Sequence, residues 1–329
     1  VRTSRAHETT SPLSRQASTS TSTSCSVIAH SPKSSLFHPQ AGFLQLSISP
    51  SNRATKIEKG YLEEVFPVIR FRRYRRYKHG WRCGRVPYIF SDMKIHQITD
   101  LHIPPEMPTE NLTHIRPNVR RQLAYVSDYP PDLLVISGDL TWPDHRKDAC
   151  RWLNSLLPDI PVAMIPGNHD DPGMMYDIFG VERCTDPSFC YMQDYPDGLI
   201  IYVNTQANAL SMNQIDQMKI WAQERSCILF IHHPPSLIGG GFMDKNYPLE
   251  NHQEVSKAIS DSGIEHVFCG HYHNQRDHRI GLEFTVHLTP SPAFQISLSN
   301  PEFEKEAFDP IVRIIDYVDG QISTELVTV

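Results

Sequence analysis

The chain has 329 residues, with 31 Lys and Arg against 37 Asp and Glu and a net charge of −6. That length can hold one large domain or two, and a hydrophobic fraction of 40% supplies a sizeable core. The longest apolar runs have the length of strands and none lies near the start, so we expect neither a membrane-spanning helix nor a signal peptide.

Charge divides the sequence into two parts. Residues 1–92 hold 15 Lys and Arg and 5 Asp and Glu, whereas residues 93–329 hold 16 and 32. The first part opens on a Ser/Thr-rich tract with few large apolar side chains, which predicts disorder. A basic, aromatic run, "IRFRRYRRYKHGWRCGRV", follows at 69–86 and is of a kind that binds nucleic acid or an anionic membrane.

A second interpretation of residues 1–92 is that they are non-native sequence upstream of the true start. The chain begins with Val1, and Met93 is the first of its nine methionines and the point where the composition changes. We therefore expect one folded domain over 93–329. The seven cysteines are scattered without C-x-x-C spacing, which favours reduced thiols and a cytoplasmic location.

From Met93 onward, strand-like and helix-like segments alternate. Apolar runs predict strands at 94–99, 132–137, 161–165, 198–203, 227–231 and 264–269, then at 284–290, 310–318 and 321–328. Helices are expected at 116–127, 143–156, 213–225 and 251–262. This order predicts an α/β fold with a mainly parallel or mixed sheet covered by helices. The Asp-Gly pair at 319–320 predicts a hairpin between the last two strands.

Polar residues follow five of these strands directly. In chain order the five motifs are "DLH" (Asp100, His102), "GDL" (Asp139), "GNHD" (Asn168, His169, Asp170), "HHPP" (His232, His233) and "GHYH" (His271, His273). The carboxyl ends of strands in an α/β sheet are where ligands bind, so we expect one shared site. Alternation along an extended chain would place His271 and His273 on one side, with Tyr272 on the other.

The residue types indicate a metal centre. Imidazoles with carboxylates suit Fe, Mn, Zn or Co, whereas Ca²⁺ and Mg²⁺ prefer oxygen ligands alone. Even seven ligands from among these residues would be too many for one four-coordinate ion, and two metals sharing a carboxylate would account for them. Two such ions form a clamp for displacement at phosphorus.

The five motifs together, D-x-H, GD, GNH[DE], a His after a strand and GHxH, resemble the calcineurin-like metallophosphoesterase superfamily over residues 93–329. The resemblance implies a four-layer α/β/β/α sandwich. It implies that Asp100, His102 and His273 hold the first metal, that Asn168, His232 and His271 hold the second, and that Asp139 bridges both.

The same resemblance implies that His169 is catalytic and not a ligand, and that His232 is the ligand in preference to His233. Asp170 is expected to orient His169 or to cap the next helix. Gly138, Gly167 and Gly270 precede candidate ligands, where a sharp turn or a close backbone approach is expected.

The expected reaction is in-line attack on a phosphate ester by a hydroxide held between the two metals, with His169 assisting the leaving group. The "HHPP" form, the insert "GGGFMDKNYPLEN" (239–251), "TPSPAFQ" (289–295) and the C-terminal segment resemble the bacterial class III cyclic-nucleotide phosphodiesterases. This favours a phosphodiesterase acting on 3′,5′-cyclic AMP. One departure is Asn204-Thr205, where that group usually has Asp-Ser.

Three alternatives stay open. The same site would serve a phosphomonoesterase or a glycerophosphodiesterase, the centre would be a non-catalytic metal-binding scaffold, or the basic run would make the chain a nucleic-acid-binding protein. The expected partner is a small phosphate ester, with no membrane and no nucleic acid. A homodimer is left open.

Overall fold

A computed structural model describes residues 92–107, 110–180, 190–195, 198–223, 225–306, 308–318 and 321–329. Residues 1–91 lie outside the described residues. The structure therefore does not bear on the predictions made for the Ser/Thr-rich tract, the basic run and the upstream segment. Where the chain is described, no helix combines the length and the apolar character needed to cross a membrane.

The first sheet has the strand order β13-β12-β1-β2-β3. Strands β1 (Met93–Ile98), β2 (Leu133–Ile136) and β3 (Val162–Met164) run parallel. Strands β12 (Ile311–Val318) and β13 (Gln321–Thr328) add an antiparallel ribbon on one side. Val318 lies opposite Gln321, which confirms the expected hairpin, although residues 319–320 are not themselves described.

The second sheet has the order β4-β5-β6-β7-β9-β8. Its four inner strands run parallel and are β5 (Gly198–Val203), β6 (Cys227–Ile231), β7 (His266–Cys269) and β9 (Phe284–Leu288). Strands β4 (Cys190–Tyr195) and β8 (Arg276–Ile280) pair antiparallel at the two edges. Every residue of β5 and β6 is buried, as expected of inner parallel strands.

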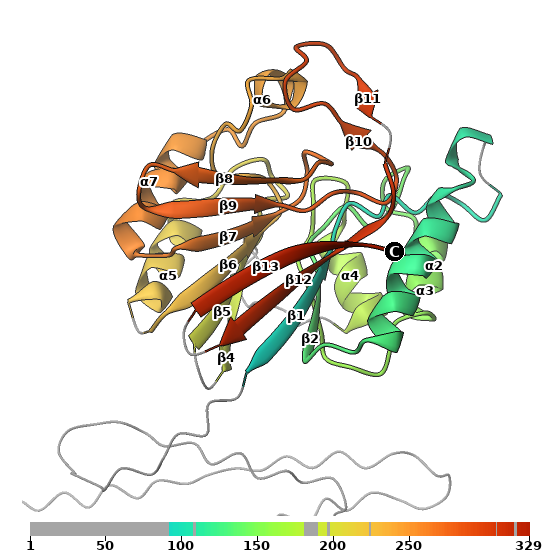
Figure 1. The fold of residues 1–329 in the computed structure, drawn as a ribbon, viewed down its shortest axis with the longest axis horizontal. Coiled ribbons are helices and arrows are strands. Elements are labelled where there is room, and N and C mark those ends of the chain that lie inside the picture. Colours follow the sequence, from blue (N-terminus) through green and yellow to red (C-terminus); the bar gives the residue numbers. More distant parts are fainter. Residues whose placement is uncertain are drawn as a thin grey trace, which may run out of the picture. The chain divides into compact units, whose positions relative to one another are not determined.

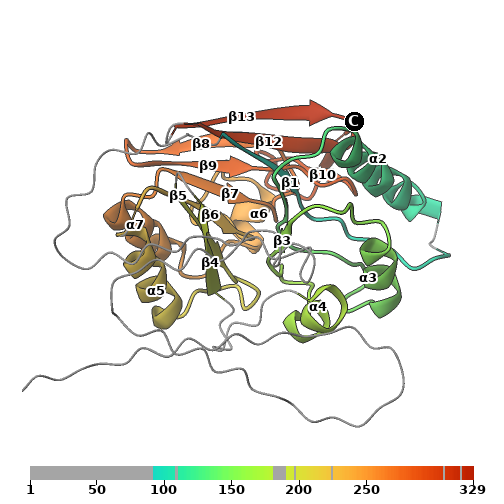
Figure 2. The ribbon, with the colours of Figure 1, turned by 90° about the horizontal axis from the view of Figure 1, so that it is seen from below.

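Helices cover the outer face of each sheet (Figures 1 and 2). Helices α2 (Ile115–Asp128), α3 (Lys147–Asn154) and α4 (Pro172–Phe179) pack on the first sheet through one apolar cluster. Helices α5 (Met212–Ala222) and α7 (His252–Ser262) pack on the second sheet through another. A third cluster fills the space between the sheets. The four-layer α/β/β/α sandwich is therefore confirmed.

Local signals explain where two of the helices begin. The Ser211 side chain accepts a hydrogen bond from the Gln214 N–H, and Gln214 reaches back to Ser211, a capping box that starts α5. The Asp171 side chain accepts from the Met174 N–H, with Pro172 in the first turn, and so starts α4.

Several elements have no counterpart in the sequence prediction. Strand β8, "RDHRI", carries no apolar run because it is an exposed edge strand, and α4 has only eight residues. Helix α6 (Phe242–Asn246) and strands β10 (Gln295–Ile296) and β11 (Lys305–Glu306) are shorter still. The helix expected at 143–156 begins only at Lys147. The four cysteines of the described segments are free thiols, as expected: Cys150, Cys190, Cys227 and Cys269.

Candidate dinuclear metal centre

The strand ends of both sheets bring the predicted residues together in two groups. The first is Asp100, His102, Asp139 and His273, and the second is Asp139, His232 and His271. In each group the candidate ligand atoms all lie within 4.8 Å of one another, and every side chain is buried. Six of the seven predicted ligands therefore converge from loops after β1, β2, β6 and β7.

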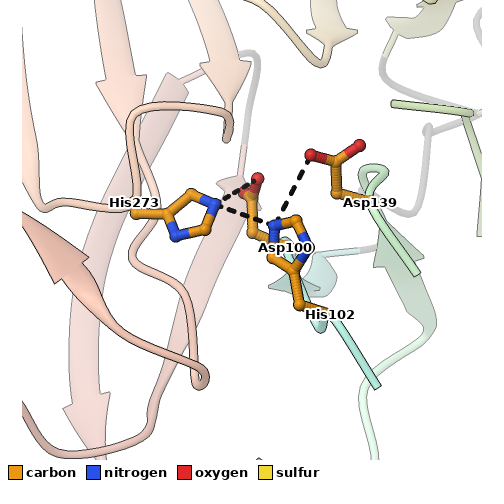
Figure 3. A group of neighbouring side chains, drawn as sticks. All are labelled: Asp100, His102, Asp139 and His273. Carbon is orange, nitrogen blue, oxygen red and sulfur yellow. Dashed lines mark hydrogen bonds and ion pairs between the residues drawn. The ribbon is translucent and has the colours of Figure 1, made fainter. Parts of the chain in front are cut away.

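Short distances hold the first group together (Figure 3). Nε2 of His273 lies 3.3 Å from Oδ1 of Asp100 and 2.9 Å from Nε2 of His102. Nε2 of His102 lies 3.6 Å from Oδ2 of Asp139. Two imidazole nitrogens and two carboxylates thus face one point, which is the donor set that a transition metal prefers.

Asp139 is the residue that the two groups share. Its Oδ2 atom lies 3.4 Å from Nε2 of His232, in addition to its approach to His102. A carboxylate in this position has the geometry required to serve two ions.

Asn168, the seventh predicted ligand, lines the cleft above the groups. Its Oδ1 atom is buried and accepts no hydrogen bond in the structure. A buried carbonyl oxygen without a partner is costly, and a cation would satisfy it. The donor set therefore fits a pair of metal ions.

Backbone carbonyls orient three of the imidazoles. Nδ1 of His232 lies 2.8 Å from the Ser137 carbonyl and Nδ1 of His273 lies 3.1 Å from that of Phe294. Nε2 of His271 lies 2.9 Å from the carbonyl of Tyr247. Donation of one ring N–H to a carbonyl leaves the other nitrogen as an acceptor, the usual arrangement around metal-binding histidines.

The candidate ligands have an unusual backbone. Seven non-glycine residues among those described have positive φ, and five of them belong to the two groups: Asp100 (51°), His102 (41°), Asp139 (54°), His271 (64°) and His273 (51°). Such left-handed conformations are costly and collect at functional sites. The extended conformation expected for "GHYH" is therefore wrong. The two histidines converge because left-handed turns aim them there, while Tyr272 is buried in the core.

The expected close approaches at glycine are confirmed. A Cβ atom on Gly167 would overlap Oδ1 of Asp139, and one on Gly270 would overlap Oδ2 of Asp100. Only glycine leaves room for these carboxylates, so the Gly preceding each motif is part of the site's construction.

Electrostatics hold most of these groups in the protonation state that metal binding requires. Burial would raise the pKa of Asp139, but His232 and then His102 hold it well below its usual range. Burial, and then His273, lower the pKa of His102 to about 3. Burial, and then His232, lower that of His271 to about 4. Ionised carboxylates and neutral imidazoles are the forms that bind metals.

His232 is the exception. Burial would lower its pKa, but Asp139 and Asp100 outweigh that effect and raise it to about 9. In the metal-free protein, His232 supplies the positive charge that faces the two buried carboxylates.

His169 lies beside the two groups. Its backbone N–H donates to Oδ1 of Asp139 at 3.0 Å, and its Nδ1 lies 2.6 Å from Oδ1 of Asp144. The ring of Trp142 contacts it edge-on at 5.1 Å. Asp144 was not predicted from the sequence. An acidic residue in the "GDLTWPD" loop is a weak signal, because only the fold shows that it reaches His169.

Asp170 has a different role from either one expected. Its carboxylate accepts hydrogen bonds from the backbone N–H groups of Gly167 and Leu140, each at 2.9 Å. It therefore ties the loop of Asn168 to the loop of Asp139. Burial, and then Asp139, raise its pKa to about 7. His169 is instead oriented by Asp144, and helix α4 is capped by Asp171.

His233 belongs to neither group. Its Nδ1 lies 2.7 Å from Oγ1 of Thr205, at the position where the sequence departs from Asp-Ser. Its ring centroid lies 4.0 Å from that of His271.

A cleft of about 740 Å³ opens over the two groups. Five of the predicted metal ligands line it: His102, Asp139, Asn168, His271 and His273. His169 also lines it. A cavity of this size holds a small organic substrate.

The family model "Calcineurin-like phosphoesterase" matches residues 93–275. The chain belongs to this family. Membership makes it a metal-dependent phosphoric ester hydrolase, as the sequence predicts.

Relatives in the family have related names. A "Probable cyclic nucleotide phosphodiesterase" of Fibrobacter succinogenes is 31% identical over 71% of this chain and 93% of its own length. The "3′,5′-cyclic adenosine monophosphate phosphodiesterase CpdA" of Escherichia coli is 23% identical over 59% of this chain and 74% of its own length. The "Glycerophosphodiester phosphodiesterase GpdQ" of Enterobacter lignolyticus is 27% identical over 49% of this chain and 64% of its own length.

A solved structure shares the fold. The purple acid phosphatase PPD1 of yellow lupin superposes with a TM-score of 0.60 at 13% identity, over 72% of this chain and 52% of its own.

Proposed function

We propose that the chain is a dinuclear metal phosphodiesterase that hydrolyses 3′,5′-cyclic nucleotides. The observation that carries the proposal is the sharing of Asp139 by two groups of buried candidate ligands. In this proposal Asp100, His102 and His273 would hold one metal, Asn168, His232 and His271 would hold the other, and Asp139 would serve both.

The donor chemistry limits the metals. Nitrogen and oxygen donors without a thiolate favour Fe, Mn, Zn or Co. When bound, such ions would act as Lewis acids toward the phosphoryl oxygens and would lower the pKa of a water towards neutrality.

His169 is the proposed catalytic residue of the chain itself. With Nδ1 held by Asp144, its Nε2 is the nitrogen left to deliver a proton to the leaving oxygen. Trp142 limits the tilt of the ring from one side. Asp144 is therefore a positioning residue.

Cyclic nucleotides are the favoured substrates because the sequence features of the C-terminal half and the Fibrobacter succinogenes relative agree on them. A glycerophosphodiester is the second candidate, because the Enterobacter lignolyticus relative is named for that activity.

Rates on four substrates with Mn²⁺ test the proposal. We expect the full-length chain to hydrolyse bis(p-nitrophenyl) phosphate and cyclic AMP faster than p-nitrophenyl phosphate, and glycerophosphocholine more slowly than cyclic AMP. Faster hydrolysis of the monoester would reject the phosphodiesterase. Preference for glycerophosphocholine would select the second candidate.

A further inference from the structure

One side of the cleft is made of aromatic rings. Phe242 is the first residue of α6, Phe294 precedes β10, and Phe303 lies two residues before β11; together we name them the aromatic wall. Ring centroids lie 5.5 Å apart for Phe242 and Phe303, and 6.5 Å apart for Phe294 and Phe303. Phe294 lies 4.4 Å from the ring of His273, so the wall begins directly beside the candidate metal centre.

Lys305 brings a positive charge to this wall. Its Nζ lies 4.4 Å from the ring centroid of Phe294 and 6.0 Å from that of Phe303. Lys305 pairs with no carboxylate of the described residues, and no other Lys or Arg among them lines the cleft. Residues 93–329 hold 16 Lys and Arg against 32 Asp and Glu, so an unpaired cation in the cleft calls for a reason.

Hydrogen bonds fix the wall in place before any substrate binds. The Asn274 side chain donates to the Ile296 carbonyl at 2.6 Å, and the Ile296 N–H donates to that of His273 at 3.3 Å. These bonds join the β10–β11 pair to the "GHYH" loop. The Phe242 N–H donates to the Asn300 carbonyl at 2.7 Å and joins α6 to the same pair.

The adjoining glycine run explains how α6 approaches so closely. A Cβ atom on Gly241 would overlap the carbonyl of Leu298. The Asp244 carboxylate accepts from the N–H groups of Ile238, Gly239 and Gly240 at 2.5–3.0 Å, which fixes the loop before the helix. The insert "GGGFMDKNYPLEN" is thus built to present Phe242 to the cleft.

We propose that the aromatic wall and Lys305 form the subsite for the nucleobase of the substrate. A flat heterocycle stacks on an exposed aromatic face, and Phe303 is 48% exposed at the wall. The Lys305 ammonium donates hydrogen bonds to the ring nitrogens or exocyclic oxygens of the base. This inference rests on the proposed phosphodiesterase function and names the part of the substrate that the cleft recognises.

The positive charge of Lys305 decides which substrates the subsite favours. Aromatic walls also bind quaternary ammonium groups such as choline, which is carried by one class of glycerophosphodiester. An ammonium already positioned on the wall repels that cation, whereas it attracts the ring nitrogens of a neutral base as hydrogen-bond acceptors. The subsite therefore favours a nucleotide over glycerophosphocholine.

Substitutions at two positions in the full chain separate these effects. Phe303→Leu removes the ring and Phe303→Tyr keeps it. Lys305→Met removes the charge and keeps the approximate length of the side chain, and Lys305→Arg keeps the charge. Lys257→Met is the control, because Lys257 is exposed on α7 and pairs with Asp261.

For Phe303→Leu we expect kcat/KM on cyclic AMP to fall by about fivefold to a hundredfold, the range of base–aromatic stacking. Its rates on glycerophosphocholine should stay within about twofold, and Phe303→Tyr should behave like the parent. For Lys305→Met we expect a lower kcat/KM on cyclic AMP and a higher one on glycerophosphocholine. Lys305→Arg should restore the parent preference, and Lys257→Met should change neither.

Adenosine, which has no phosphate, gives a readout that needs neither metal nor turnover. Calorimetric titration of the metal-free chain should show binding that weakens in Phe303→Leu. Equal losses on all substrates, or unchanged adenosine binding, would overturn the subsite. If instead the parent chain hydrolyses no phosphodiester yet still binds adenosine through Phe303, the proposed function fails and the nucleobase subsite stands.

Discussion

The backbone N–H of His169 donates a hydrogen bond to Oδ1 of Asp139 at 3.0 Å. One carboxylate oxygen of Asp139 is therefore engaged by the loop that carries the proposed acid. The other, Oδ2, is left to face His102 and His232, at 3.6 Å and 3.4 Å. This hydrogen bond thus fixes the position of His169, the proposed proton donor, relative to Asp139, the proposed bridging ligand.

Asp139→Asn should remove more activity than any other single substitution among the candidate ligands. The asparagine keeps an oxygen for the His169 N–H but loses the charge that would serve both metals. Metal content, measured by mass spectrometry, should fall towards zero per chain. His273→Asn is the matched control and should lose only one metal. Two metals retained in Asp139→Asn would show that this residue is not the bridge.

His169→Ala should keep both metals and the fold while losing rate. General acid assistance contributes about 10²–10⁴-fold, so the rate on cyclic AMP should fall on that scale. Bis(p-nitrophenyl) phosphate should lose less, because a nitrophenolate leaves without a proton. Loss of bound metal would identify His169 as a ligand and contradict its proposed role.

Asp144→Asn separates positioning from proton transfer. The side-chain contact that the described residues give Asp144 is with Nδ1 of His169. The effect of Asp144→Asn should therefore have the same leaving-group dependence as that of His169→Ala and be smaller. In the His169→Ala background, Asp144→Asn should lower the rate little further, because the effects of substitutions at coupled residues are not additive. Full additivity in this double-mutant cycle would mean that Asp144 acts independently of His169.

Gly167→Ala should damage the centre through sterics alone. The added Cβ would overlap Oδ1 of Asp139, so we expect metal content and activity to fall together. Gly180→Ala is the control, because its φ is 66° but nothing lies within 4 Å of the added atom. That variant should lose about 1–2 kcal/mol of stability and keep its metals. Equal metal content in both variants would contradict the close approach.

His96 should make the fold sensitive to mild acid. Burial, and then Lys94, lower the pKa of His96 from 6.5 to about 4. The unfolded chain therefore binds a proton near pH 6.5 that the folded chain does not accept until about pH 4. The contribution to stability is complete above pH 6.5 and declines as the pH falls from 6.5 towards 4.

His96→Phe keeps a ring on Tyr125, whose centroid lies 5.8 Å away, and removes the titration. Urea unfolding between pH 4 and 7.5 should show a shallower dependence on pH, by at most about 1.4 kcal/mol per pH unit. Parallel stability curves for parent and variant would show that His96 does not titrate in this range.

Much of the fold and the candidate site could be predicted because their signals are local. The inner strands are apolar runs, and residues of the types that bind metals stand directly after them, so Asp100, Asp139 and His271 can be predicted as candidate ligands from the sequence. Strand β8 was missed because a solvated edge strand has no apolar run to reveal it.

What could not be predicted depends on distant parts of the chain. The role proposed for Asp144 depends on its 2.6 Å contact with His169, and that proposed for Lys305 depends on its position over the ring of Phe294. Neither contact can be predicted from the sequence around the residue. The left-handed backbone of His271 and His273 was also hidden, because non-glycine side chains give no local sign of positive φ. Alternation therefore predicted that both histidines face one site, which they do, but from an extended backbone that the structure does not have.

The most direct test of the central claim is anomalous diffraction from crystals of the full-length chain loaded with Mn²⁺. The account predicts two peaks roughly 3.5–4 Å apart, a spacing typical of two-metal sites, with Asp139 between them and Asn168 on one of them. A single peak, or two peaks with no ligand from Asp139, would contradict the dinuclear centre.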